Sequence, residues 1–386
     1  MIDRNIIIAC LACLLLAGGV FAQRLVTVDT TAPPNDEYAE VWSISPASPA
    51  GGPLFWLPGP AHVPGPPDLG GVTCDNTDGV LYSCDGANVY SRNNPYYWPA
   101  TPPPPPPPAI PGGLGPITGM AISHGFGGPV RFWWCDNNQI VQADPGGVIT
   151  YGPFAVGPIA QLRGLDTDPF TGHVWAVGAN SVVYEINVGG ATGVVVNTFP
   201  PTTYAPPPVP ATGIALDKSC PNPLQVFVSY PGPGGAGPPA PGAAFEIFTG
   251  VAVPLIHAFP NGLTYHAAPV RLPGAGSCGG APPPLALYNS PMSIGNAGFQ
   301  LTVPGMGPGL LVISLGHVPG GLTVAGLIGT LYVDLASTYW VFPVAPPFNI
   351  PLTTAVVCTT AYAQWAFPCG PQWVLSDALQ LDLSAP

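Results

Sequence analysis

Acidic side chains recur at turn positions between short apolar runs. An aspartate lies four residues after a glycine at Asp75, Asp168 and Asp217. Because an aspartate in a turn hydrogen-bonds the backbone two residues on, the sequence predicts three structural turns. The alternative is a calcium site at Asp75 and Asp78, where hard oxygen ligands cluster without the length or the final Glu of an EF-hand loop. No other cofactor is expected.

A second set of polar side chains supplies the candidate ligand-binding residues. These residues follow the second apolar run of each unit, or lie in the connections beside it: Asp85, Asp136, Asn137, Asn138, Arg163 and Asn180. Loops on a rigid scaffold usually carry binding residues, and amide and carboxylate groups can hydrogen-bond sugar hydroxyls or a partner's backbone. The sequence therefore predicts a binding face here, with ordinary solvated turns as the alternative.

The sequence offers few groups of residues that could act together in catalysis. Asp166 is the one acidic residue placed on a predicted inner strand, so general acid–base chemistry lacks a second member. Glu185 and Glu246 lie on predicted third strands, and we expect both to face solvent. His173 is expected to be structural, since no histidine adjoins a Ser or Cys in a nucleophile setting. The pattern favours a non-catalytic binding or structural protein; the alternative is a metal-dependent lactonase or a glycan-cleaving hydrolase.

The elements that position these residues form a repeat. Glycines at 71, 119, 164, 213 and 262 recur every 45 to 49 residues, each followed by short Val/Ile/Tyr/Trp-rich runs. A period near 47 with four short strands is typical of a β-propeller blade.

The two ends of the repeat region look like half-blades. Val41 and Leu54 begin two predicted outer strands, and residues 262–266 look like a first strand without continuation. We expect residues 41–58 to pair with residues 262–266 and close a ring of five blades, because closure leaves no open sheet edge. An open β-solenoid or a sandwich is the alternative.

The sequence thus predicts an all-β protein: a five-bladed β-propeller closed by half-blades from both ends and followed by a β-sandwich. We expect a signal peptide over 1–22, a lead-in over 23–40, the propeller over 41–266 and the sandwich over 267–386. A retained membrane anchor is the alternative for 1–22. No later segment has the ~20 uninterrupted apolar residues of a transmembrane helix.

Composition narrows the choice of partners. Charged residues make up 7% of the chain and the formal net charge is −12. An acidic surface has no patch for a phosphate backbone, so neither nucleic acid nor an anionic membrane is expected. We expect a secreted or cell-surface protein that binds a protein or a carbohydrate. The proline run 102–108 predicts a stiff polyproline II loop, or alternatively a ligand for a partner's aromatic groove.

Seven cysteines follow the predicted signal peptide, and export makes disulfides the default for them. An odd number leaves at least one thiol free or bonded to another chain. No C-x-x-C spacing is present, so we expect no zinc site. Cys358 and Cys369, eleven residues apart across a predicted hairpin, are the expected pair.

Two resemblances support this organisation. Residues 41–265, with the text Gly-Leu-Asp-Thr-Asp-Pro from Gly164 and Gly-His-Val-Trp from Gly172, resemble the NHL-type and gluconolactonase-like propellers. The last 115 residues, with the text of 274–278, 294–299, 301–305, 362–365 and 375–381, resemble a C-terminal domain of secreted planctomycete-like bacterial proteins. The second resemblance implies an accessory role. Gly329 stands near the place of a second cysteine in that family, which leaves the partner of Cys278 open.

Overall fold

The structure is a computed structural model of the chain. It describes residues 23–29, 38–44, 53–58, 70–84, 86–93, 105–124, 129–137, 139–155, 161–190, 192–204, 207–218, 224–232, 242–255, 260–265, 269–272, 274–290, 292–294, 296, 298–350, 352 and 359–384. Within these ranges the chain is built from strands, together with one short 3-10 turn, η1 at Pro201–Thr203. The prediction of an all-β chain is confirmed. No helix in the described ranges has the length and apolar character that crossing a bilayer requires.

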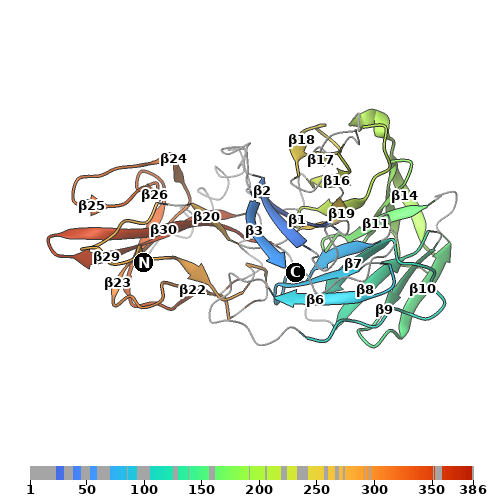
Figure 1. Cartoon of the computed structure of the whole chain (residues 1–386), viewed down its shortest axis with the longest axis horizontal. Helices are drawn as coiled ribbons and strands as arrows, with labels where there is room; N and C mark the ends of the chain where they lie inside the picture. The colour runs from blue at the N-terminus through green and yellow to red at the C-terminus, as the bar shows by residue number, and fades with distance from the viewer. Residues whose placement is uncertain are drawn as a thin grey trace, which may run out of the picture.

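Five small antiparallel sheets gather at one end of the molecule (Figure 1). The first contains β4 (Gly71–Cys74), β5 (Val80–Cys84) and β6 (Val89–Asn93). The second contains β7 (Gly119–His124), β8 (Val130–Cys135), β9 (Gln139–Ala143) and β10 (Ile149–Ala155). The third contains β11 (Leu162–Thr167), β12 (Val174–Gly178), β13 (Val183–Asn187) and β14 (Val194–Phe199), and the fourth β15 (Gly213–Leu216), β16 (Val226–Tyr230), β17 (Ala243–Glu246) and β18 (Ala252–Pro254). The fifth contains β19 (Pro260–Tyr265), β1 (Gln23–Asp29), β2 (Tyr38–Ile44) and β3 (Pro53–Pro58).

The repeat glycines form a ring where the inner strands meet. A Cβ added to Gly71 would lie 3.0 Å from the Cα of Gly119, and one on Gly119 would lie 2.8 Å from the Cα of Gly164. The series continues at 2.9 Å from Gly164 to Gly213 and at 2.6 Å from Gly213 to Gly262, and it returns to Gly71 at 2.9 Å. Only a residue without a Cβ lets backbones approach this closely. The inner strands β4, β7, β11, β15 and β19 therefore surround one axis in the manner of a β-propeller.

The ring closes through a strand that the sequence did not predict. β19 pairs with β1, with Leu25 opposite Tyr265 and Val26 opposite Thr264, and β2 and β3 follow outward. As the predicted closure requires, β2 and β3 share one sheet with β19, but the predicted pairing of residues 41–58 with residues 262–266 is not direct, because β1 lies between them. Gln23–Asp29, assigned from the sequence to a lead-in, is the second strand of the closing sheet.

Apolar cores fill the spaces between neighbouring sheets. Phe132, Trp134 and Ile117 lie in a core with residues of the first and second sheets, and Trp133, Phe154 and Leu165 lie in the next core. Further cores join the third sheet to the fourth and the fourth to the closing sheet. These four cores pack the five sheets in chain order around the axis.

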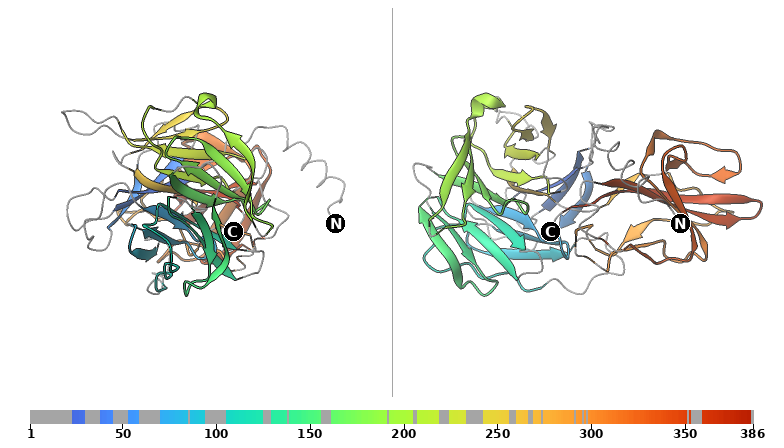
Figure 2. Two further views of the ribbon diagram at one scale, coloured as in Figure 1. Left: turned by 90° about the vertical axis from the view of Figure 1, so that its right-hand side faces the viewer. Right: turned by 180° about the vertical axis from the view of Figure 1, so that it is seen from behind.

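The remaining chain forms a layered β region, seen end to end with the ring in Figure 2. Its main sheet has the order β20 (Val270–Leu272), β30 (Gln372–Asp382), β29 (Thr360–Cys369), β23 (Gly309–Ser314) and β27 (Tyr339–Val344), with β25 (Leu327–Ile328) parallel to β30. One small sheet contains β21 (Leu287–Tyr288), β22 (Gln300–Thr302) and β28 (Phe348–Asn349), and another contains β24 (His317–Leu322) and β26 (Leu331–Val333). Trp365 and Leu311 face a core with the first small sheet, whereas Tyr362 and Val333 share a core with the second.

A disulfide joins Cys278 to Cys369, with their Cα atoms 5.9 Å apart. The predicted pair of Cys358 with Cys369 is therefore wrong. Cys369 ends β29, and the tight turn that follows it leads into β30, so the hairpin lies after Cys369 and not before it. Cys358 lies outside the described residues. Gly329 forms an isolated bridge with Ala275 in the loop that carries Cys278.

Candidate functional site

The turn face predicted from the sequence is assembled through the connections between sheets. The Leu162 N–H donates to the Asn137 carbonyl at 3.2 Å, and the Ala179 N–H donates to the Gln161 carbonyl at 2.8 Å. The connection at 161–162 therefore ties the turn after β8 to the turn after β12. In the same way, the Ile117 N–H donates to the Gly86 carbonyl at 2.9 Å beside the first sheet.

Asp136 supports this face from within. The residue is buried, and its Oδ1 accepts a hydrogen bond from the Gln139 N–H at 2.9 Å. Its Oδ2 accepts from the Gly115 N–H at 3.0 Å and from Gln139 Nε2 at 3.1 Å. These bonds fix the loop at Gly115 against the turn, which is a structural task. The sequence pattern of an acidic residue in a turn could not distinguish this task from ligand binding.

The other predicted binding residues differ in accessibility. Asn180 is exposed, while Asn137 and Arg163 are half-buried. Asp85 and Asn138 lie outside the described residues. Asn180 Oδ1 accepts a hydrogen bond from the Val182 N–H at 3.2 Å, so its carboxamide is held at the tip of the turn.

A depression of about 540 Å³ opens beside Asn180. The turn after β12 forms one wall, and the proline-rich connection between the third and fourth sheets forms the other. The lining residues are uncharged: Ala179, Asn180, Ser181, Pro201, Thr202, Pro207, Pro208, Val209 and Pro210. Uncharged walls of this kind suit a neutral ligand that offers apolar surface and a few hydrogen-bonding groups.

A pair of buried tyrosines fixes the wall from behind. The Tyr204 hydroxyl donates to the Ser181 carbonyl at 2.5 Å and lies 2.8 Å from the Tyr230 hydroxyl. Burial raises the pKa of both phenols, so they remain protonated donors. Ser181 has a φ of 62° and Gln161 a φ of 58°, and these are the two non-glycine residues with positive φ in the described chain. Such strain, at about 1–3 kcal/mol per residue, concentrates at functional sites.

A buried polar belt lies at the opposite end of the inner strands. The Lys218 Nζ is 2.9 Å from Asp166 Oδ1, and both side chains are only 2% exposed. Asp166 also accepts hydrogen bonds from the backbone N–H groups of Thr167 at 2.7 Å and Leu216 at 2.8 Å. The Thr167 hydroxyl donates to the Ile122 carbonyl at 2.7 Å. The belt thus links the second, third and fourth sheets, and each of its polar groups has a partner within the fold.

Asp75 and Asp78 lie in the turn that follows the first inner strand. Asp75 Oδ1 is 2.8 Å from His124 Nε2 and accepts from the N–H and hydroxyl of Thr77 at 2.8 and 2.6 Å. Burial disfavours the Asp75 carboxylate, yet the His124 contact and the Thr77 donors outweigh it and lower the pKa. The pKa of Asp78 is raised to about 6, first by desolvation within the turn and second by the charge of Asp75. Asp78 is itself an exposed residue. The calcium site at this turn stays a prediction.

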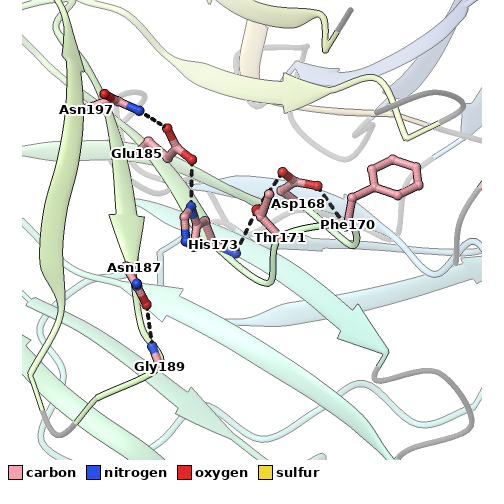
Figure 3. A network of polar contacts seen from close by, with 8 residues as sticks. All are labelled: Asp168, Phe170, Thr171, His173, Glu185, Asn187, Gly189 and Asn197. Atoms are coloured by element: carbon pink, nitrogen blue, oxygen red, sulfur yellow. Dashed lines mark hydrogen bonds and ion pairs between the residues drawn. The ribbon is translucent and has the colours of Figure 1, made fainter. Parts of the chain in front are cut away.

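The turn at Asp168 belongs to a network of polar contacts on the third sheet (Figure 3). Asp168 Oδ1 accepts from the Phe170 N–H at 2.8 Å, and Oδ2 accepts from the Thr171 hydroxyl at 2.7 Å, as expected of a structural turn. His173 Nδ1 lies 2.6 Å from Glu185 Oε1, whose other oxygen accepts from Asn197.

The expectation that both third-strand glutamates face solvent is wrong. The Glu185 side chain is 12% exposed and is engaged by His173, and Glu246 is 3% exposed. Glu246 Oε2 accepts hydrogen bonds from the N–H groups of Phe248 and Thr249 at 3.1 and 2.6 Å. The position on the third strand suggested exposed side chains, but each carboxylate contacts hydrogen-bond donors of its own sheet.

The buried thiols of Cys74 and Cys135 have the character of core residues. Burial raises the pKa of Cys135 to about 12 and raises that of Cys74 well above its ordinary value. A protonated, inaccessible thiol is a poor nucleophile. Among the described residues, no three His, Cys, Asp or Glu side chains converge as a metal-ion site requires.

Known proteins resemble this chain in their solved structures and not in their sequences. No family model matches the chain, and no curated protein matches its sequence. A luciferin-regenerating enzyme aligns at 14% identity and a TM-score of 0.29, over 53% of this chain and 69% of its own. The β-propeller domain of Cps50 (Swd1) from Myceliophteria thermophila aligns at 12% identity and a TM-score of 0.32, over 64% of this chain and 92% of its own. BBS1N in complex with ARL6DN aligns at 12% identity and a TM-score of 0.29, over 95% of this chain and 94% of its own. Likeness this distant says nothing of function.

Proposed function

We propose that this chain is a secreted or cell-surface binding protein without catalytic activity, built on a complete five-bladed propeller of the NHL-like type. The closed ring of glycines supports the blade count. The Cys278–Cys369 bond supports export, because disulfides persist in oxidising compartments. The layered region from residue 267 serves as an accessory β-sandwich domain.

The depression beside Asn180 is the proposed binding site, and its position is the observation that carries the proposal. It lies on the turn face that the sequence nominated for binding, where loops stand on a rigid ring of sheets. The tyrosine pair and the strained Ser181 hold its wall in a defined shape. A preformed wall lowers the entropy cost of binding a ligand.

The ligand class follows from the lining. Asn180 and Thr202 offer hydrogen-bonding groups, and the prolines offer flat apolar surface. No charged side chain lines the depression, so a neutral glycan or an uncharged extended peptide fits it better than an anion or a cation. Turnover is not proposed, because the described carboxylates of the axis are engaged in hydrogen bonds and ion pairs of the fold.

A glycan array and a library of uncharged peptides, probed with the purified protein, test this function. The Asn180→Ala variant should lose at least about tenfold in affinity for any ligand found, since it removes the carboxamide at the rim. Asn187→Ala is the matched control. Asn187 Oδ1 accepts from the Gly189 N–H at 2.8 Å, in a similar exposed turn at the other end of the third sheet (Figure 3).

The results of these experiments distinguish the proposed function from its alternatives. Equal affinity of the two variants and the wild type would place the site elsewhere. Hydrolysis of a lactone or a glycan by the wild type would contradict the non-catalytic function and support the alternative, a propeller enzyme. Recovery of the mature protein from a membrane fraction with residues 1–22 still present would contradict secretion and support a membrane anchor.

A further inference from the structure

The edge strand β27 carries an exposed apolar surface that the proposed binding site does not use. Tyr339, Trp340 and Val341 are consecutive and are 45%, 46% and 45% exposed. β27 pairs with β23 on one side only, and no described residue pairs with its outer edge. Natural edge strands are usually protected by charges, by prolines or by a covering element, and an apolar edge is a template for another strand. Pro343 near the end of β27 leaves residues 339–341 without such protection.

The backbone groups that point outward can be assigned from the register. The Leu315 N–H donates to the Thr338 carbonyl at 3.0 Å, just before β27 begins. Hydrogen-bonding direction alternates along an antiparallel strand, so residues 340, 342 and 344 bond to β23. The N–H and C=O groups of Tyr339 and Val341 therefore point away from the sheet. Pro343 agrees with this assignment, because a proline within a sheet occupies a position whose missing N–H would face outward.

Charged residues are few enough in this region for two identical chains to meet at this edge. The chain carries a net charge of −12, so two copies repel each other over most of their surface. From residue 267 onward the charged residues are Arg271, Asp334, Asp377 and Asp382. Asp377 is paired with Arg271, and neither a Lys nor a Glu occurs in this region to guard the edge.

We propose that β27 pairs antiparallel with β27 of a second copy of this chain, about a two-fold axis at Val341. In this register the two Val341 residues exchange two hydrogen bonds. The Tyr339 N–H of each copy donates to the Pro343 carbonyl of the other. Pro343 has no N–H to return a bond to the Tyr339 carbonyl, so the pairing has one hydrogen bond at each of these positions in place of two. Tyr339 packs against Pro343 across the axis, and the two main sheets become one continuous sheet.

Cysteine cross-linking of the full mature chain tests the register directly. Residues of a hydrogen-bonded antiparallel pair have Cα atoms ~5.5 Å apart, within the ~4.4–6.8 Å that a disulfide spans. Val341→Cys should therefore give a covalent dimer under mild oxidation. Leu322→Cys is the matched control, since Leu322 is 50% exposed on β24, which belongs to a different sheet from β27.

Sedimentation of non-cysteine variants provides the second measurement. Val341→Lys places two positive charges together at the axis and should weaken dimerisation at least about tenfold, whereas Leu322→Lys should leave it unchanged. A wild type that is monomeric at every concentration, together with no excess cross-linking at position 341, overturns the proposal. Dimers that form equally well in Val341→Lys and Leu322→Lys also overturn it, as does capture of an extended peptide by a β27 edge that never pairs with itself.

Discussion

The buried pair of Asp166 and Lys218 gives the sharpest test of how the ring is held together. Replacing Lys218 with Met keeps most of the apolar stem and removes the ammonium group 2.9 Å from Asp166 Oδ1. The carboxylate then stays buried with two backbone N–H donors and no counter-charge. Leaving one member of a buried pair without its partner costs about 3–5 kcal/mol.

The expected loss can be measured by thermal unfolding. For a region of ~150–250 residues, each kcal/mol lowers Tm by about 2–4 °C, so Lys218→Met should lower Tm by about 6–20 °C. Trp133, Trp134 and Trp175 are buried between the sheets and report the loss of packing by fluorescence.

A double-mutant cycle isolates the pair from other effects of the substitution. Lys218→Met should cost much less in an Asp166→Asn background, because the neutral amide does not need a buried counter-ion. The reasoning is refuted if Lys218→Met costs the same free energy in both backgrounds, or if its cost in the wild type is below ~1 kcal/mol.

Three further predictions concern the ring of glycines, the disulfide and the loss of folding stability at low pH. Gly213→Ala should lower the free energy of unfolding by about 1–3 kcal/mol in urea titration, because its Cβ would lie 2.4 Å from the Leu263 backbone N, whereas Gly112→Ala, with open space around it, should change little. Cys369→Ser should destabilise the C-terminal region by about 2–5 kcal/mol, since the bond closes a sequence separation of 91; equal melting of the oxidised wild type and the variant in calorimetry would contradict this. Asp75 has a folded pKa below its unfolded value of about 3.9, so its ionised form stabilises the fold above that pH, and the gain is lost as pH falls through the folded pKa. Asp75→Asn should flatten this acid dependence in unfolding scans below about pH 4.

The sequence predicted those features of the fold that local chemistry repeats. The glycine spacing located all five inner strands, because close approach at an axis demands the same residue in every unit. It misplaced the closing pair, because Gln23–Asp29 directly follows the apolar leader-like segment and has no glycine of its own to mark it. The half-blade pattern marked the other strands of the closing sheet, but nothing near Gln23–Asp29 marks it as their neighbour.

The turn that carries Asn180 could be located from the sequence, whereas the contacts around it could not. Asn180 was singled out because it lies in a turn between two β-rich runs, and its accessibility agrees with that choice. The role of Asp136 depends on Gly115, and that of Asp166 on Lys218, each a partner distant in sequence. The strain at Ser181 is equally hidden, since serine carries no sequence signal for a positive φ.

The pairing of β1 with β19 also orders events during synthesis. A ribosome delivers Gln23–Asp29 first, yet the strand that receives it, Pro260–Tyr265, emerges only after the other four sheets have left the exit tunnel. The closing sheet therefore cannot be completed before residue 265 has been made. Among the described strands, Gln23–Asp29 is thus the one separated from its inner partner by the longest stretch of chain in the ring.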